Sequence, residues 1–259
     1  MERRDFLVGN LSGASLGLAA TLASDRFGRK DAAKAPAPTP GLPAGVQASF
    51  AQQGEDLVVR QILNEVLKIE HPSYIDIGAW DPIVDSNTYL FYLTGGAGVL
   101  VEPNPQFAER LKTVRPRDTV LGIGIGVTDQ TEADYYVMAI PQTNTFSKEQ
   151  ADKLVAAAGK QFLKEVIKLP LVNVNRVLAE NFETAPNFFS IDIEGLDLEI
   201  LKTLDFGRFR PQVFCVETIE TVSRRFETEV VDFMRANDYA WRGGSFVNSI
   251  FIDRRIVRN

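Results

Sequence analysis

The sequence contains one cysteine and one histidine, and this scarcity narrows the chemistry open to the protein. With Cys215 alone no disulfide can form within the chain, and its apolar neighbours predict a small buried side chain. With His71 alone a metal site built from several histidines is excluded, and a histidine-dependent catalytic triad would have to use this residue. Because His71 directly precedes Pro72, we expect it in a loop rather than in a catalytic site.

The sequence also lacks a long apolar run and an excess of positive charge. A membrane-spanning helix takes roughly 20 apolar residues, but the most apolar N-terminal stretch, residues 7–23, is interrupted by Asn10 and Ser12. Residues 1–40 hold six basic and four acidic side chains, which leaves 22 basic and 30 acidic ones, a net charge of −8, for the rest. We therefore expect no stable membrane span in the mature domain and no nucleic-acid partner, since phosphate binding needs a basic surface. The sequence fixes no oligomeric state.

Residues 1–44 differ in composition from the remainder of the chain. Arg3-Arg4-Asp5-Phe6-Leu7 matches the twin-arginine pattern, and a stretch rich in Gly, Ala and Ser follows it. Residues 35–43 are rich in Pro and Ala, which favours an extended linker. We therefore predict a twin-arginine-like leader and linker over 1–44 and one domain over 45–259. The alternative is a basic tail with a chance Arg-Arg pair.

From Phe50 onward, segments with strand and helix patterns alternate, which predicts a mostly parallel sheet with helices on both faces. The predicted strands are 74–77, 98–101, 119–123, 133–138, 169–172, 188–193 and 212–216. The predicted helices are 54–68, 86–93, 105–114, 148–168, 175–181, 196–204 and 227–236. Gly243-Gly244 separate 239–242 from 248–253, which favours a closing antiparallel hairpin.

The most informative stretch is Tyr74-Ile-Asp-Ile-Gly-Ala-Trp-Asp-Pro82, an apolar strand that runs into a tight turn. The next apolar run ends in Glu102, at the carboxyl edge of the neighbouring strand. Ligands bind at that edge in open α/β sheets, and an acidic residue there can accept both ribose hydroxyls of a nucleoside. The alternative for Glu102 is a structural place before the helix that begins at Pro105.

The pattern Gly-x-Gly-x-x-Gly is absent, which favours S-adenosylmethionine over a dinucleotide and disfavours an NAD-dependent enzyme. Gly122-Ile-Gly-Ile-Gly126 has the wrong spacing and no helix after it, so we place it at the end of the third strand.

Five motifs in order resemble those of FkbM-type methyltransferases. They are Ser49-Phe-Ala-Gln-Gln-Gly-Glu-Asp56, Asp76-Ile-Gly-Ala79, Ser86-Asn-Thr-Tyr89, Val101-Glu-Pro-Asn-Pro105 and Ile191-Asp-Ile-Glu-Gly195. The resemblance runs from about Ser49 to Ile252. It implies the class I methyltransferase fold, a Rossmann-like α/β fold with a mostly parallel seven-stranded sheet, helices on both faces and a C-terminal antiparallel hairpin. It also implies methyl transfer from S-adenosylmethionine, usually to a hydroxyl oxygen. The family often has Asn and Gly where this chain has Trp80 and Pro82, so these two are not carried over as contacts.

We expect the cofactor S-adenosylmethionine to lie over the first two strands. Asp76 binds its amino group or braces the turn, while Gly78 and Ala79 leave room for it. Glu55 and Asp56 belong to a lid ahead of the first strand or favour the start of a helix. The predicted cofactor-binding residues are Gln53, Asp76, Gly78, Ala79, Asn87, Glu102, Asn104 and Asp192.

Asp192 and Glu194 are the predicted catalytic residues. They end the fourth strand, and residues two apart share a strand face, so both carboxylates point into one pocket before Gly195. Either can take the proton of an acceptor hydroxyl, or the pair can bind a divalent cation, although we assign no metal ligand. The alternative for Glu194 is to cap the helix that begins at Leu196.

Together these patterns predict an S-adenosylmethionine-dependent O-methyltransferase that acts on a hydroxyl of a small molecule or glycan. The alternative is an exported, non-catalytic binding protein that retains the fold, because a supply of S-adenosylmethionine is not expected outside the cytoplasm. The leader favours export to the periplasm or beyond, whereas the cofactor favours the cytoplasm, so the location stays open.

Overall fold

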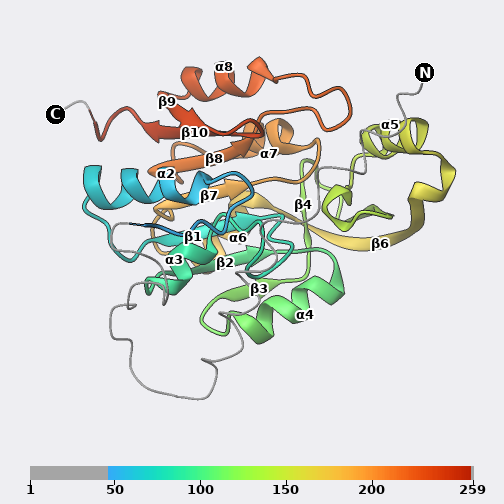
Figure 1. Cartoon of the computed structure of the whole chain (residues 1–259), viewed down its shortest axis with the longest axis horizontal. Helices are drawn as coiled ribbons and strands as arrows, with labels where there is room; N and C mark the ends of the chain where they lie inside the picture. The colour runs from blue at the N-terminus through green and yellow to red at the C-terminus, as the bar shows by residue number, and fades with distance from the viewer. Residues whose placement is uncertain (1–45, 258–259) are drawn as a thin grey trace. The chain divides into compact units, whose positions relative to one another are not determined.

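The computed structural model describes residues 46–257, so the predicted leader and linker lie outside the described residues. Seven strands form the main sheet in the order β3-β2-β1-β7-β8-β10-β9 (Figure 1). They are β1 (Ser73–Ile77), β2 (Ala97–Val101), β3 (Thr119–Leu121), β7 (Phe188–Ile191), β8 (Val213–Glu217), β9 (Tyr239–Gly244) and β10 (Asn248–Asp253). Neighbouring strands run parallel, except that β10 is antiparallel to β8 and β9. The predicted sheet with its C-terminal antiparallel hairpin is confirmed.

Helices cover both faces of this sheet, as predicted. One face is covered by α2 (Glu55–Gln61), which continues into a π-helical turn (Ile62–Val66), and by α3 (Tyr89–Leu93) and α4 (Pro105–Val114). The other face is covered by α6 (Val174–Asn181), α7 (Asp197–Thr203) and α8 (Thr228–Ala236). Apolar residues spaced three and four apart turn from each helix toward the sheet. Among residues 46–257, no helix combines the length and apolar character of a membrane span.

The two faces of the sheet have separate cores because side chains alternate along each strand. On β1, Ile75 and Ile77 enter one core and Tyr74 enters the other. Asp76 interrupts the second core as a carboxylate that is only 4% exposed. Burying a charge is costly unless it is paired and hydrogen-bonded. A carboxylate at the centre of the sheet is therefore not explained by packing.

A second sheet of three strands, in the order β4-β6-β5, stands beside the main sheet (Figure 1). Its strands are β4 (Gly124–Gly126), β5 (Glu132–Met138) and β6 (Leu163–Asn173). Between β5 and β6 lie the 3₁₀ turn Pro141–Thr143, α5 (Lys148–Ala158) and the 3₁₀ turn Lys160–Phe162. Strand β4 follows β3 directly, so the second sheet begins at the carboxyl ends of the parallel strands of the main sheet, where the ligand is expected.

The predicted helix over 148–168 is wrong beyond Ala158. Gly159 ends α5 with φ +92, a backbone conformation that side-chain-bearing residues rarely adopt. The residues that follow form β6, which pairs antiparallel with β5 and includes the short strand expected at 169–172. Helical spacing within 148–168 did not reveal this partner, because β5 lies some distance away in the sequence.

The predicted third strand is also shorter than expected. It ends at Leu121 rather than at residue 123, and Gly124–Gly126 forms β4, which pairs with β6 instead of extending the main sheet. A Cβ at Gly124 would lie 2.4 Å from the Phe146 ring. The absence of a side chain at Gly124 therefore lets Phe146 pack closely against β4.

Candidate active site

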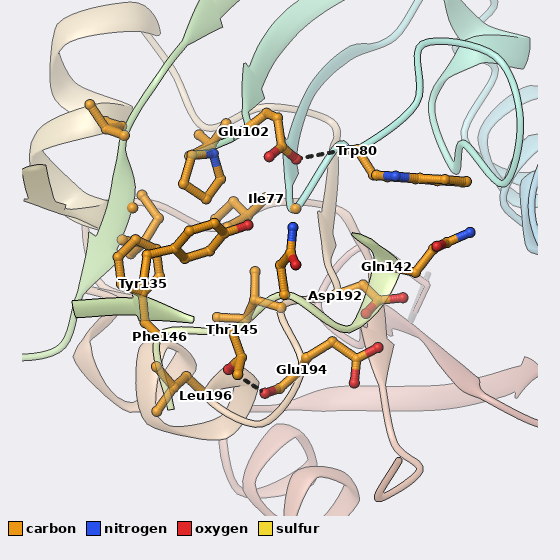
Figure 2. A pocket seen from close by; sticks show the side chains of 18 of the residues that line it. Ile77, Trp80, Glu102, Tyr135, Gln142, Thr145, Phe146, Asp192, Glu194 and Leu196 are labelled. Atoms are coloured by element: carbon orange, nitrogen blue, oxygen red, sulfur yellow. Dashed lines mark hydrogen bonds between the residues drawn. The ribbon is translucent and has the colours of Figure 1, made fainter. Parts of the chain in front are cut away.

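A pocket that encloses about 600 Å³, its open mouth included, lies where the carboxyl ends of β1, β2 and β7 face the second sheet. Gly78, Glu102 and Asp192 line it from the main sheet. Figure 2 shows Glu102 at the top of the pocket, Asp192 and Glu194 at the lower right, and Tyr135 reaching in from the other side. The pocket therefore occupies the sheet edge at which α/β proteins bind their ligands.

Gly78 makes the turn after β1 possible. Its φ is +89, and the N–H groups of Gly78 and Ala79 both donate to the carbonyl of Val101, at 3.0 and 3.2 Å. A Cβ at Gly78 would lie 1.9 Å from the carbonyl oxygen of Asp192, so no side chain fits between these two strand ends. Ala79, in contrast, is buried in the core and is not among the residues that line the pocket.

Glu102 follows β2 and is held by two backbone N–H groups. Its Oε2 accepts from Trp80 at 2.9 Å, and its Oε1 accepts from Asn104 at 2.7 Å. Burial raises the pKa of Glu102 to about 7, and the charge of Asp76 adds to this, while the two N–H donors oppose it. A carboxylate oxygen accepts more than one hydrogen bond, so each oxygen keeps capacity for a ligand in the pocket.

Asn104, and not Glu102, caps helix α4. The Asn104 side chain accepts from the N–H of Gln106 at 3.0 Å, and Pro105 takes the first helical position. Asn104 does not line the pocket with its side chain, whereas Glu102 does.

Asp76 lies beneath the pocket and does not line it. Its Oδ2 accepts from the Thr88 hydroxyl at 2.6 Å, and that hydroxyl also accepts from Nη2 of Arg115 at 3.0 Å. Arg115 is fully buried and pairs with Asp118 at 2.7 Å. Of the two roles expected for Asp76, the contacts among the described residues are those of a brace for the turn.

Asp192 and Glu194 both line the pocket, but not as successive residues of one strand. Strand β7 ends at Ile191, and the Asp192 N–H still donates to the carbonyl of Ile77 at 3.0 Å. Glu194 then adopts φ +59, so the chain turns. The expectation of a regular strand was wrong, yet this turn brings carboxylate oxygens of Asp192, Glu194 and Glu217 within 4.8 Å of one another.

Glu194 does not cap helix α7. Asp197 accepts from the N–H groups of Ile193 and Gly195, at 3.2 and 3.3 Å, and so closes the turn before the helix. The carboxylate of Glu194 instead accepts from the hydroxyl of Thr221, in the loop after β8.

The pKa values of these carboxyl groups are raised. Burial raises the pKa of Asp192 well above its usual range, and the charges of Glu194 and Asp197 add to this. Burial also raises the pKa of Glu194 to about 7, against the hydrogen bond from Thr221. A carboxylate with a raised pKa holds a proton more strongly than usual, so it is a better base near neutral pH.

The sequence profile of the methyltransferase FkbM domain matches residues 76–240, which is more than half of the chain. The chain belongs to this family.

Solved structures with a similar fold include three methyltransferases. An FkbM methyltransferase from Methylobacillus flagellatus aligns with a TM-score of 0.43 and 15% identity, over 71% of this chain and 44% of that protein. A TehB-like SAM-dependent methyltransferase from Corynebacterium glutamicum aligns with a TM-score of 0.40 and 8% identity, over 78% and 88%. An O-methyltransferase from Bacillus cereus, solved in complex with SAH, aligns with a TM-score of 0.37 and 12% identity, over 82% and 84%. No curated protein matches the sequence.

Family membership and the order of the strands in the main sheet give this chain the class I methyltransferase fold that its motifs predicted. The chain spans less than half of the Methylobacillus protein's length.

Gln53 and Asn87, two further predicted cofactor residues, do not line the pocket of this FkbM chain. Oε1 of Gln53 accepts from the N–H of Phe246 at 2.9 Å, and the neighbouring Glu55 accepts from Ser245 and Asn248 at 2.5 and 3.0 Å. The segment expected as a lid is thus tied to the turn between β9 and β10. Asp56 accepts from the N–H groups of Phe50, Ala51 and Leu57, which holds the chain that enters α2.

Asn87 lies beside β7, where its Nδ2 donates to the hydroxyl of Ser190 at 3.1 Å. Its Oδ1 is buried and has no hydrogen-bond partner in the described part of the chain.

Strand β5 and the segment between β5 and α5 supply pocket residues that the motifs did not indicate. They are Tyr135, Gln142, Asn144, Thr145 and Phe146. Burial raises the pKa of Tyr135, and the nearby negative charge of Glu102 adds to this, so the phenol stays protonated. The Thr145 hydroxyl donates to the carbonyl of Glu194 at 2.9 Å, and this bond joins the segment after β5 to the turn at Glu194. The alternation of residues 133–138 predicted a strand, but only the folded chain brings Tyr135 opposite Glu102.

Proposed function

We propose that this FkbM-family chain transfers a methyl group from S-adenosylmethionine to a hydroxyl oxygen of a small molecule or glycan. One observation carries the proposal: Glu102 is oriented by the Trp80 and Asn104 N–H groups and lines the same pocket as Gly78 and Asp192. A ribose diol needs a fixed acceptor of this kind. A charged hydrogen bond contributes about 1.5–3 kcal/mol net.

The chain's own residues fit the cofactor in charge as well as in shape. S-adenosylmethionine supplies a methyl group on a positively charged sulfur. Glu102, Asp192 and Glu194, at the carboxyl ends of β2 and β7, give the pocket a wall that is negative when these carboxyl groups are ionised. A negative wall favours a cation at close range. The positive φ and missing side chain of Gly78 leave the turn open to a ligand.

The reaction also needs a place for the acceptor proton. When the acceptor oxygen bonds to the methyl carbon, the bond between that carbon and sulfur breaks, and the hydroxyl proton must leave. The Asp192 carboxylate lines the pocket, and burial raises its pKa well above the usual range. We therefore assign Asp192 as the base, with Glu194 beside it. Alignment of the reacting atoms in the pocket accounts for the rest of the rate acceleration.

The class of acceptor follows from the same lining. An acidic pocket repels phosphate-rich acceptors, so nucleic acid is disfavoured. Tyr135 and Phe146 add aromatic surface opposite the carboxylates. Such a mixture suits a neutral polyhydroxy or aromatic molecule with a free hydroxyl.

The test is calorimetric titration of the purified chain with S-adenosylmethionine, S-adenosylhomocysteine and NAD. We expect binding of the first two and none of NAD. Glu102→Gln should weaken binding by roughly 10- to 100-fold, because it removes the charged acceptor. Glu109→Gln is the matched control, since Glu109 lies on α4 nearby with an exposed side chain paired to Lys112. Its affinity should equal that of the unchanged protein.

Equal affinities for the Glu102 and Glu109 variants would remove Glu102 from the site. Tight cofactor binding without turnover on any hydroxyl acceptor would instead favour the alternative, an exported binding protein that retained the fold.

A further inference from the structure

Glu217 joins Asp192 and Glu194 although it belongs to a different strand. It ends β8, which pairs with β7 through Ile191 and Val216. Carboxylate oxygens of the three residues lie within 4.8 Å of one another. Figure 2 shows the Asp192 and Glu194 side chains extending together along one side of the pocket.

Most of the main electrostatic influences on this cluster come from other carboxylates. Apart from burial, the largest influences on the pKa of Asp192 are four other carboxylates, those of Glu194, Asp197, Asp76 and Glu55, and all of them raise it. For Glu217 they are again carboxylates, and its pKa is also raised. Arg224 acts only on Glu194 among the three, and more weakly than burial, Thr221 and Asp197 do. Ionised carboxylates this close together repel one another unless a cation lies between them.

An independent observation comes from Asn248 on β10. Asn248 lies directly opposite Glu217 in the antiparallel ladder, so both side chains project from the same face of the sheet. It is 2% exposed, and its Nδ2 donates to Glu55, one of the carboxylates that act on Asp192. Its Oδ1 is buried and has no hydrogen-bond partner within residues 46–257. A buried oxygen without a partner calls for an ion or water.

The distances between the carboxylate oxygens are short enough for one divalent cation to bind all three. Two oxygens bound to one Ca²⁺ at about 2.3–2.6 Å can be roughly 4.6–5.2 Å apart when they lie on opposite sides of it. The cluster's limit of 4.8 Å meets this condition without any movement.

The three carboxylates also border two different cavities. Asp192 and Glu194 line the pocket described above, whereas Glu217 lines a second hollow whose charged residues include Glu220, Glu227, Lys153 and Arg225. An ion held by the three carboxylates would therefore lie at the boundary between the pocket and the second hollow.

We propose that Asp192, Glu194 and Glu217 bind a divalent cation such as Ca²⁺ or Mn²⁺, with Oδ1 of Asn248 as a further ligand. Carboxylate and amide oxygens are what such hard cations prefer. The proposal rests on the proposed function and refines it: the cation would lower the pKa of an acceptor hydroxyl bound to it, and a carboxylate oxygen of Asp192 or Glu194 that is not a ligand would take the proton.

The experiment measures metal binding directly on the purified full chain, without an acceptor. The protein is stripped with chelator and titrated with MnCl₂, CaCl₂ and MgCl₂, by calorimetry and, for Mn²⁺, by electron paramagnetic resonance. We expect one Mn²⁺ or Ca²⁺ per chain. Bound metal should raise the melting temperature.

Asp192→Asn and Glu217→Gln should each weaken Mn²⁺ binding at least tenfold. Because each substitution removes repulsion, the metal-free variants should melt at the same temperature as the unchanged protein or higher, which shows that they fold. Glu149→Gln is the control: this side chain borders the second hollow but is 79% exposed, and its loss should leave Mn²⁺ affinity unchanged.

Two outcomes would overturn the proposal: no binding of any of the three ions at millimolar concentration, or binding that the Asp192 and Glu217 variants leave unaltered, which would mean an adventitious ion only. S-adenosylhomocysteine is titrated in parallel. If it binds while the metals do not, the cation site fails and the proposed function stands. If it does not bind to the folded chain, the proposed function itself fails.

Discussion

At the scale of single residues, the chemistry depends on carboxylates placed just beyond strand ends. Glu102 is held by two N–H donors and has a pKa of about 7, so its charge changes near neutral pH. The cause is burial, because a carboxylate at the sheet edge exchanges water for only two hydrogen bonds. If Glu102 binds the ribose as proposed, this binding will therefore depend on pH.

We predict that affinity for S-adenosylhomocysteine falls by roughly tenfold between pH 8 and pH 6. Only ionised Glu102 accepts both hydroxyl hydrogen bonds, and the ionised fraction drops about tenfold across a pKa of about 7. Calorimetric titrations at pH 6, 7 and 8 measure this. In Glu102→Gln the dependence over this range should flatten. A decline of the same steepness in that variant would assign the pH effect to another group.

At the scale of elements, one buried ion pair joins α3, α4 and the first two strands. Arg115, just beyond the end of α4, pairs with Asp118 and donates to Tyr74 on β1 and to Thr88 before α3. Asp118 in turn accepts from the N–H of Gly98 on β2. Through Thr88 this network reaches Asp76, the carboxylate beneath the pocket. It sets the position of the turn that carries Gly78.

We predict that Arg115→Met destabilises the fold by roughly 3–5 kcal/mol, because it leaves Asp118 and Asp76 as buried charges without a cation. Lys112→Met is the matched control on the same helix, since its exposed pair with Glu109 should contribute at most about 1 kcal/mol. Urea unfolding of both variants, followed by circular dichroism, measures the difference. Similar midpoints for the two variants would show that Arg115 is not needed to hold the network.

At the scale of the whole molecule, the sheet, its two cores and the pocket are all built from residues 46–257. The segment over 1–44 contains Arg3-Arg4 and the Pro/Ala-rich stretch. We therefore propose that this segment directs the protein to an export route and contributes nothing to the site. Twin-arginine signals direct transport across the bacterial inner membrane.

We predict that removing residues 1–44 leaves a folded chain with unchanged affinity for S-adenosylhomocysteine. A reporter fused after residue 44 should be exported, and replacing Arg3 and Arg4 together by Lys should keep it inside. Cell fractionation with a reporter of known location checks both results. If the reporter stays in the cytoplasm with both arginines present, the export proposal is wrong and the concern about cofactor supply disappears.

Local pattern was enough for much of this molecule. Apolar runs located the strands of the main sheet within a few residues, and helical spacing located most helices, because both periodicities are properties of neighbouring residues. The same patterns placed Glu102 and Asp192 at the carboxyl ends of two strands of the main sheet, and both side chains line the pocket. The order of the motifs indicated the family that the profile then matched.

Contacts between distant segments decided the rest. Residues 163–173 form a strand because β5 offers a partner, which their own spacing does not reveal. Glu217 meets Asp192 and Glu194 because β8 pairs with β7 and the chain turns at Glu194. Tyr135 faces Glu102 only once the second sheet stands beside the main one. The sequence thus determined which elements form and which acids end the strands, while tertiary pairing decided which of them share a pocket, because pairing joins residues that no local period connects.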